Sequence, residues 1–127
     1  MFEKLELTRM AQALAAHAGT RMGVIAENVA HADTPGYKAR DLGDFAAVWA
    51  GKGEGMRATR PGHLSDPPRQ AAARPFVSGG EEAPNGNSVS LEKEMVKMAE
   101  ARQEHEMALA IYRSTSEVIR ASLGRGR

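Results

Sequence analysis

Apolar side chains recur at helical spacing in two long segments, one near each end of the chain. Between residues 7 and 29 they fall on two adjacent stripes. Between residues 91 and 123 they follow alternating steps of four and three residues, with a second stripe beside that row. Because one stripe suffices for one partner helix, two long helices that are each apolar on two sides are expected to pack on each other and on a further neighbour.

The first helix is expected to be marginal on its own. Gly19 and Gly23 each lower helix propensity by about 1 kcal/mol relative to alanine, so packing must supply the stability. Its first stripe is Leu7, Met10, Leu14 and Val24, and its second is Ala11, Ala15, Ala18, Met22, Ile25 and Val29.

The second helix has a more regular row, which we call the 4-3 row: Leu91, Met95, Met98, Arg102, His105, Leu109, Tyr112, Ser116, Ile119 and Leu123. Met107, Ile111, Val118 and Ala121 form its second stripe. We expect Leu109 to face the first helix and Ile111 to face a different subunit. The residues expected to form the assembly seams are Leu14, Met22, Ile25, Val29, Met95, Met98, Leu109, Ile111, Tyr112 and Ile119.

A tight turn is expected after the first helix, which should end near Ala32. Pro35 disfavours helical backbone at Thr34, and Gly36 can adopt the positive φ that a type II turn needs at its third position. The Asn28 amide, in the last two turns of the helix, is expected to bond to the chain that returns beyond Gly36. The structural motif at this turn is Asn28, Asp33, Thr34, Pro35, Gly36 and Tyr37.

A second turn signal, Asn85, Gly86 and Asn87, precedes the second helix, because Asn and Gly tolerate positive φ. Ser90 is a suitable N-cap, and Glu92 and Glu94 fall in the first turn, where carboxylates interact favourably with the helix N-terminus. The second helix is expected to continue to about Leu123, where Gly124 ends it.

These elements predict an all-α fold with a single domain. Residues 1–33 form the N-terminal helix, residues 34–89 the turn and a loop-rich insert containing glycine and proline, and residues 90–127 the C-terminal helix and a basic tail. The two long helices are expected to form an antiparallel coiled-coil-like pair. Within the insert, only Phe45 to Trp49 has the apolar density to anchor it, and Gly51 to Gly55 is interpreted as a flexible linker.

Composition excludes several classes of function. A formal net charge of +1 and a pI near 8.1 do not indicate a nucleic-acid-binding protein. No run approaches the roughly 20 apolar residues of a membrane span, and no apolar segment of a cleavable signal is seen. The absence of cysteine rules out disulfides and thiol catalysis. With 42% hydrophobic residues and few aromatics, the core is thin for 127 residues, so partners are expected to contribute stability.

No catalytic chemistry is indicated. The histidines, His17, His31, His63 and His105, lack the spacing of a helical metal pair, and His17 and His105 are expected to be partly buried at helix interfaces. The acidic residues of the second helix, Glu94 among them, are interpreted as a solvated or intersubunit charged face. We therefore expect no enzyme activity, no metal, no cofactor and no small-molecule substrate.

Both terminal motifs resemble those of the flagellar rod and hook protein family. The N-terminal one is Asn28-Val29-Ala30 followed by Ala32-Asp33-Thr34-Pro35-Gly36-Tyr37-Lys38-Ala39-Arg40-Asp41. The C-terminal one is Asn85-Gly86-Asn87-Ser88-Val89 with Leu91-Glu92-Lys93-Glu94-Met95 and Lys97-Met98-Ala99-Glu100. The match covers both terminal segments and leaves the middle unconstrained. This chain departs from the family's pattern at His31, Ala101 and His105.

The resemblance implies a structural subunit of the proximal rod, which self-assembles through its terminal helices into a tube that transmits torque and carries exported proteins. It implies other copies of the chain, other rod proteins and the junction of the MS ring with the export gate as partners. It also implies a periplasmic location in the basal body, reached by type III export without a cleaved signal and without membrane insertion. The alternative from the residues alone is a small helical adaptor or export chaperone that binds one partner helix.

Overall fold

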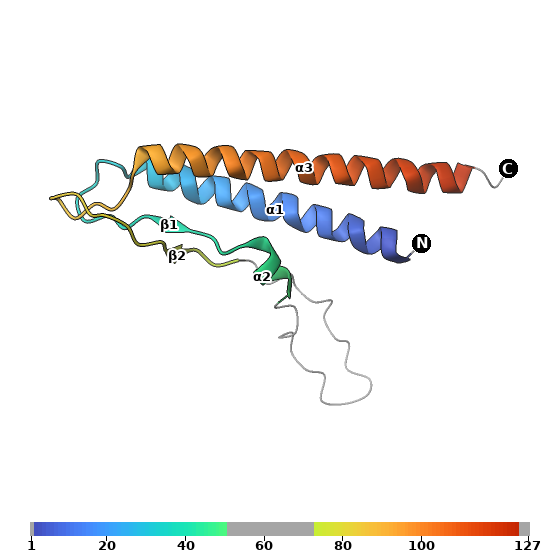
Figure 1. Ribbon diagram of the computed structural model, residues 1–127, viewed down its shortest axis with the longest axis horizontal. Helices are drawn as coiled ribbons and strands as arrows, with labels where there is room; N and C mark the ends of the chain where they lie inside the picture. The colour runs from blue at the N-terminus through green and yellow to red at the C-terminus, as the bar shows by residue number, and fades with distance from the viewer. Residues whose placement is uncertain (1, 51–72, 125–127) are drawn as a thin grey trace, which may run out of the picture.

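Two long helices dominate the computed structural model, which describes residues 2–50 and 73–124. Helix α1 spans Phe2–Ala30 and helix α3 spans Leu91–Gly124. They lie side by side and run in opposite directions, so that the N- and C-termini are at the same end (Figure 1). We call the other end, where α1 finishes and α3 begins, the closed end. The prediction of a mostly helical chain with long helices at both ends is confirmed.

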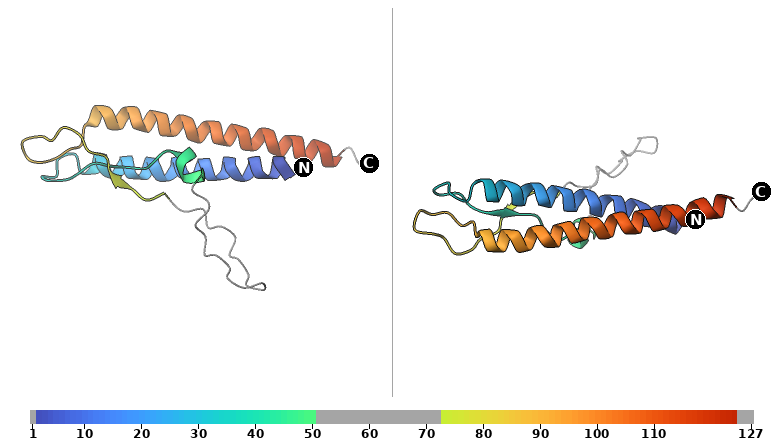
Figure 2. Two further views of the ribbon diagram at one scale, coloured as in Figure 1. Left: turned by 60° about the horizontal axis from the view of Figure 1, so that its bottom comes forward. Right: turned by 90° about the horizontal axis from the view of Figure 1, so that it is seen from above.

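Three short elements of the insert lie along the helix pair, between the closed end and the middle of α1. Strand β1 (Arg40–Asp41) pairs antiparallel with strand β2 (Phe76–Val77), and Arg40 lies opposite Val77 in the register. Helix α2 (Phe45–Ala50) follows β1, and its Phe45, Val48 and Trp49 side chains are half-buried. Figures 1 and 2 show these elements on one side of the pair. The pairing of β1 with β2 was not predicted. The Gly51 to Gly55 segment and His63 lie outside the described residues.

The contact between α1 and α3 is built mainly from small side chains. Ala11 and Ala18 on α1 and Ala101 and Ala108 on α3 are each at most 2% exposed, and Ile25 is fully buried. Alanine lets two helix backbones approach closely, at the cost of little apolar area per residue. The pair is therefore closely fitted but gains modest hydrophobic stabilisation.

The buried face of α3 differs from the expected one. Its buried residues are Glu94, Ala101, Ala108 and Thr115, which recur every seven residues. The 4-3 row contributes only half-buried residues at the edge of the contact, while its Met95 is 71% exposed. The interpretation of Glu94 as part of a solvated charged face is thus wrong. The 4-3 row follows the large apolar side chains. The helices instead bury small side chains and a carboxylate that has partners within the chain.

The helix ends follow from local signals. The last α-helical residue of α1 is Ala30, two residues before the expected end, and the chain then turns through Thr34 to Tyr37. Helix α3 begins directly after Ser90, whose carbonyl accepts a bond from the Glu94 N–H at 2.9 Å, as an N-cap carbonyl does. At about 1.5 Å per residue the helices span roughly 44 and 51 Å, which lets them pair over most of their length.

We expect Ala108→Met to destabilise the chain by about 1 to 3 kcal/mol, because a long side chain overpacks a position with no exposed surface. Ala110→Met is the matched control, since Ala110 is exposed on the same helix and the change should stay within about 0.5 kcal/mol. Urea unfolding followed by circular dichroism measures both. Equal losses for the two variants would contradict the observed face of α3.

Candidate functional site: a polar junction at the closed end

Three buried polar side chains, Asn28, Asn87 and Glu94, join the segments that meet at the closed end, and we call them the polar junction. Asn28 comes from the last turns of α1, Glu94 from the first turn of α3, and Asn87 from the loop that precedes α3. Each is at most 3% exposed. Buried polar groups are costly unless they are paired, so their partners decide what the junction does.

The Asn28 carboxamide takes the place of a third strand beside β1. Its Oδ1 accepts the Arg40 N–H at 3.0 Å, and its Nδ2 donates to the Arg40 carbonyl at 2.7 Å. These two bonds pair the backbone N–H and carbonyl of Arg40, which lie on the edge of β1 that faces away from β2. The Tyr37 hydroxyl also donates to Oδ1 at 3.4 Å. As the sequence suggested, the amide reaches the chain beyond Gly36, and it holds β1 against α1.

Asn28 also pairs with the buried carboxylate of Glu94. Asn28 Nδ2 donates to Glu94 Oε2 at 3.0 Å, and the Lys97 ammonium lies 3.3 Å from Glu94 Oε1. A buried carboxylate is stable only when both oxygens have partners. Here one partner comes from α1 and one from α3 itself, so the pairing fixes the longitudinal register of the two helices.

An ion-pair network extends from the junction along the insert. Asp41 of β1 lies 3.2 Å from Arg21 Nε and 3.6 Å from Lys97 Nζ, so it ties the insert to both long helices. Its Oδ1 also accepts the Leu42 N–H at 2.8 Å. Arg21 reaches Glu100 at 3.6 Å, although that carboxylate is largely exposed. The half-buried pairs around Asp41 matter more than the exposed one, which is worth about 1 kcal/mol or less.

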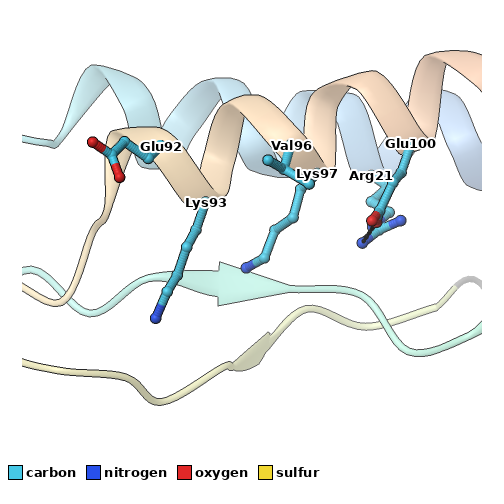
Figure 3. Close-up of a pocket in the computed structure, with 6 residues that line it drawn as sticks. All are labelled: Arg21, Glu92, Lys93, Val96, Lys97 and Glu100. Atoms are coloured by element: carbon cyan, nitrogen blue, oxygen red, sulfur yellow. Dashed lines mark ion pairs between the residues drawn. The ribbon is translucent and has the colours of Figure 1, made fainter.

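An open cavity of about 500 Å³ lies beside this network, and Figure 3 shows the six residues that line it. Lys97 points toward β1, and the Arg21–Glu100 pair closes one end of the row of side chains. The lining mixes cations, carboxylates and one apolar residue: Arg21, Glu92, Lys93, Val96, Lys97 and Glu100. Three cations and two carboxylates offset most of each other's charge, so the cavity has no strong field of one sign.

Asn87 closes the end of α1 from the opposite loop. Its Nδ2 lies 2.9, 2.9 and 2.8 Å from the carbonyl oxygens of His31, Ala32 and Thr34, which follow the last α-helical residue. Its Oδ1 accepts the Val89 N–H at 2.7 Å. Carbonyls beyond a helix C-terminus lack N–H donors from the helix. Here the amide of a side chain 53 to 56 residues along the sequence lies within hydrogen-bond distance of these carbonyls.

The two glycine turns meet back to back. Gly36 has φ 73°, and the Tyr37 N–H bonds to the Thr34 carbonyl at 3.3 Å, as in a type II turn. The Gly36 N–H donates to the Asn85 carbonyl at 3.0 Å. Gly86 has φ 82°, and a Cβ there would lie 3.4 Å from the Gly36 Cα. Glycine at these positions therefore serves both conformation and close contact.

The remaining motif and seam residues are distributed along the molecule. Asp33 and Pro35 are exposed at the turn. Among the seam residues Ile25 is buried between α1 and α3, while Val29, Met95 and Tyr112 are exposed. The others are half-buried: Leu14, Met22, Met98, Leu109, Ile111 and Ile119. Leu109 and Ile111 are thus both half-buried in one chain, and the assignment of Leu109 to the first helix and of Ile111 to a different subunit stays a prediction.

His17 anchors the insert, a role that the sequence did not indicate. Its Nε2 lies 2.9 Å from the Gly43 carbonyl, and its ring contacts the edge of the Phe45 ring at 5.7 Å between centroids. Phe45 in turn lies 5.6 Å from Trp49. His17 is buried as expected, but its hydrogen bond goes to the insert and not to α3. His105 is half-buried.

Among the described residues, no group of three or more His, Cys, Asp or Glu side chains is placed to hold a metal ion. Within the same residues, no helix combines the length and hydropathy required to cross a bilayer. The polar junction is made of mutually satisfied hydrogen bonds and ion pairs. These bonds hold the two long helices and the turns between them in fixed positions.

Comparison with known proteins identifies two similar chains with the same description. The sequence is 30% identical over 118 residues to the flagellar basal body rod protein FlgB of Agrobacterium fabrum, covering 88% of each chain. It is 31% identical over 105 residues to FlgB of Salmonella typhimurium, covering 72% of this chain and 73% of that one. No family model matches the sequence. These relatives confirm the resemblance that the two terminal motifs indicated.

We expect Asn28→Asp to cost about 3 to 5 kcal/mol, because it removes the donor to Glu94 and buries a second carboxylate beside it. Adding Glu94→Gln should recover part of that loss, since a glutamine amide can donate to the new aspartate. Urea unfolding of both variants measures the difference. A double variant no more stable than Asn28→Asp alone would show that the two side chains are not coupled.

Gly36→Ala should destabilise the closed end by about 1 to 2 kcal/mol, the usual cost of left-handed backbone for a residue with a Cβ. Gly43→Ala is the control, because Gly43 has no positive φ and its Cβ would meet nothing within 4 Å. Thermal unfolding of the two variants provides the comparison. A Gly36→Ala chain as stable as Gly43→Ala would exclude the type II turn as a determinant of the fold.

Proposed function

Because the chain belongs to the family of the flagellar basal body rod protein FlgB, we propose that it is a structural subunit of the proximal rod and not an enzyme. Its terminal helices form the assembly unit, an antiparallel coiled-coil-like pair. The subunits self-assemble through these helices into the tube that transmits torque and carries exported flagellar proteins. The polar junction keeps the unit in one register while neighbours cover its surface.

One observation carries this proposal: the most regular apolar row of α3 lies at the edge of the helix contact and leaves several large side chains uncovered. Of the 4-3 row, Leu91 is 51%, Met95 71% and Leu123 67% exposed. Burying a large apolar side chain yields about 1.5 to 3 kcal/mol, so a chain that leaves several of them uncovered gains much by association. Long exposed apolar rows are typical of surfaces that bind other protein.

The proposed partners are other copies of the chain, other rod proteins and the junction of the MS ring with the export gate. The proposed location is the periplasmic rod of the basal body, which the chain reaches by type III export without a cleaved signal. The names of the two relatives support a place in the basal body rod. The individual partners and the export route rest on the resemblance of the motifs alone.

The alternative is a small helical adaptor or export chaperone that binds one partner helix. The same apolar row would serve that function equally well. An adaptor, however, has no evident use for two glycine turns locked against each other by Asn85 and Asn87. Purified basal bodies distinguish the two functions, because a rod subunit remains in them and an adaptor does not.

We expect Met95→Asp to abolish incorporation into basal bodies and swimming without unfolding the free chain, since Met95 is mostly solvent-exposed in one copy but would be desolvated in an assembly. The matched control is Ala99→Asp, one turn along α3 and also exposed. Basal bodies purified from cells that carry each variant are probed for the chain. Normal incorporation of Met95→Asp would remove the 4-3 row from the proposed assembly surface.

A further inference from the structure

The turn before α3 contains a chemically reactive pair of residues. Asn85 is followed by Gly86, and this is the only Asn-Gly sequence in the chain. The carboxamide carbon of an asparagine can be attacked by the backbone nitrogen of the next residue, which closes a five-membered succinimide ring. Glycine has no side chain to hinder that nitrogen. The other two asparagines, Asn28 and Asn87, precede residues with side chains, so Asn85 is where this reaction is easiest.

The folded turn holds the two reacting groups away from each other. The Gly86 N–H donates to the Ala83 carbonyl at 2.8 Å, so the attacking nitrogen already has a partner. The Asn85 side chain is also engaged, because its Oδ1 accepts the Asn87 N–H at 3.1 Å. Ring closure would have to break the first bond and would draw the carboxamide away from the second.

The peptide group between Asn85 and Gly86 is held from both sides. Its carbonyl accepts the Gly36 N–H at 3.0 Å, while its N–H donates to Ala83. A planar peptide group that is bonded at both ends cannot rotate to bring its nitrogen toward the side chain. The first of these bonds comes from the other glycine turn, which follows α1. The geometry that opposes the reaction therefore depends on the closed end as a whole.

The side chain is nevertheless accessible to solvent, since Asn85 is exposed. Water and base can reach it in the folded chain, so burial is not what opposes the reaction. Opening of the closed end would free the Gly86 nitrogen and the Asn85 carboxamide together. Slow chemistry on a group that reacts only in an opened state proceeds in proportion to the population of that state.

We propose that Asn85 is a site of spontaneous deamidation, which the closed end suppresses and which proceeds when that end opens. The modification therefore records how long a copy of the chain has spent with its closed end open. This inference goes beyond the proposed function and does not depend on it.

The reaction needs only water as a co-reactant. The Gly86 nitrogen forms a bond to the Asn85 carboxamide carbon, the bond from that carbon to Nδ2 breaks, and Nδ2 leaves as ammonia with the proton lost from the Gly86 nitrogen. Water then opens the ring at one of its two carbonyls. Breaking the new bond gives aspartate, whereas breaking the original main-chain bond gives isoaspartate, in which the main chain runs through the side-chain carbons.

The two products differ in their effect on the fold. Aspartate keeps the main chain unchanged, and its carboxylate can still accept the Asn87 N–H. Isoaspartate lengthens the main chain by one carbon and displaces the carbonyl that accepts the Gly36 N–H. It also shifts Gly86, at which a Cβ would lie only 3.4 Å from the Gly36 Cα. A chain that contains isoaspartate at this position therefore cannot re-form the contact between the two turns.

The rate of deamidation tests the suppression directly. The full chain is incubated at mildly alkaline pH, where the backbone nitrogen loses its proton more readily, and mass spectrometry of proteolytic peptides follows Asn85 over time. We expect the folded chain to react at least about tenfold more slowly than the chain unfolded in guanidinium chloride. Equal rates in the two states would overturn the proposal.

The dependence on the closed end is tested with the two glycine variants. Gly36→Ala should raise the rate in the folded chain about 5- to 30-fold, which corresponds to its expected loss of stability. Gly43→Ala should react like the unaltered chain, because Gly43 has no positive φ. Low concentrations of guanidinium chloride give the same test on the unaltered chain. Equal rates for the two variants, with no acceleration at low denaturant, would show that the closed end does not control the reaction.

Asn85→Ser is the matched control for the effect of the product on the fold. The serine hydroxyl can accept the Asn87 N–H in the same kind of turn, but it offers no carboxamide carbon. After incubation in the unfolded state and refolding, unaltered chains that carry isoaspartate should have a lower Tm than fresh chains, whereas Asn85→Ser should recover fully. Labelling with an isoaspartyl methyltransferase measures the isoaspartate content. Isoaspartate-containing chains as stable as fresh ones would refute the predicted effect on the contact between the turns.

Discussion

The hydrogen bond between the Asn28 carboxamide and the Glu94 carboxylate is the constraint on which the rest of the structure depends. It joins the end of α1 to the start of α3, while the same amide holds β1 through the Arg40 backbone. The alanines between the helices offer a nearly uniform surface on which other registers would bury similar area. Only one register gives the buried Glu94 its partners. In any other register its carboxylate would be buried without a partner, at a cost of several kcal/mol. Polar pairing therefore selects the register.

That register decides which side chains remain outside. With Glu94, Ala101, Ala108 and Thr115 turned inward, the large apolar residues of the 4-3 row fall at the edge of the contact or beyond it. The single chain thus combines a narrow, close helix contact with an apolar surface that is exposed to solvent. The stability of the subunit and its proposed association depend on the same register, because each large residue left out of the internal contact is available to a neighbour.

Local signals predicted the helices and turns well, and long-range pairing could not be predicted. Pro35 and Gly36 determine their turn by backbone sterics alone, so their sequence was sufficient. The Asn87 amide, whose two N–H groups lie within hydrogen-bond distance of three carbonyls, is more than fifty residues away from them in the sequence, and no periodicity predicts that pairing. The prediction of the buried face of α3 was wrong for two reasons. A hydrophobic pattern gives methionine and leucine more weight than alanine, and it does not predict that a carboxylate with hydrogen-bond partners can lie in a helix contact. The two-residue strands are too short to leave a pattern.

The two ends of the helix pair differ in how they are held. At the closed end, Asn28, Asn87 and Glu94 are buried and fully paired, and the two glycine turns lock against each other. Toward the termini the side chains of Leu5, Leu7 and Leu123 are exposed instead. Burial and internal hydrogen bonding set local stability, so the closed end is the ordered template and the terminal turns gain most from neighbours. A subunit built this way keeps a fixed register at the closed end, where the exposed Leu91 and Met95 remain available to a neighbour.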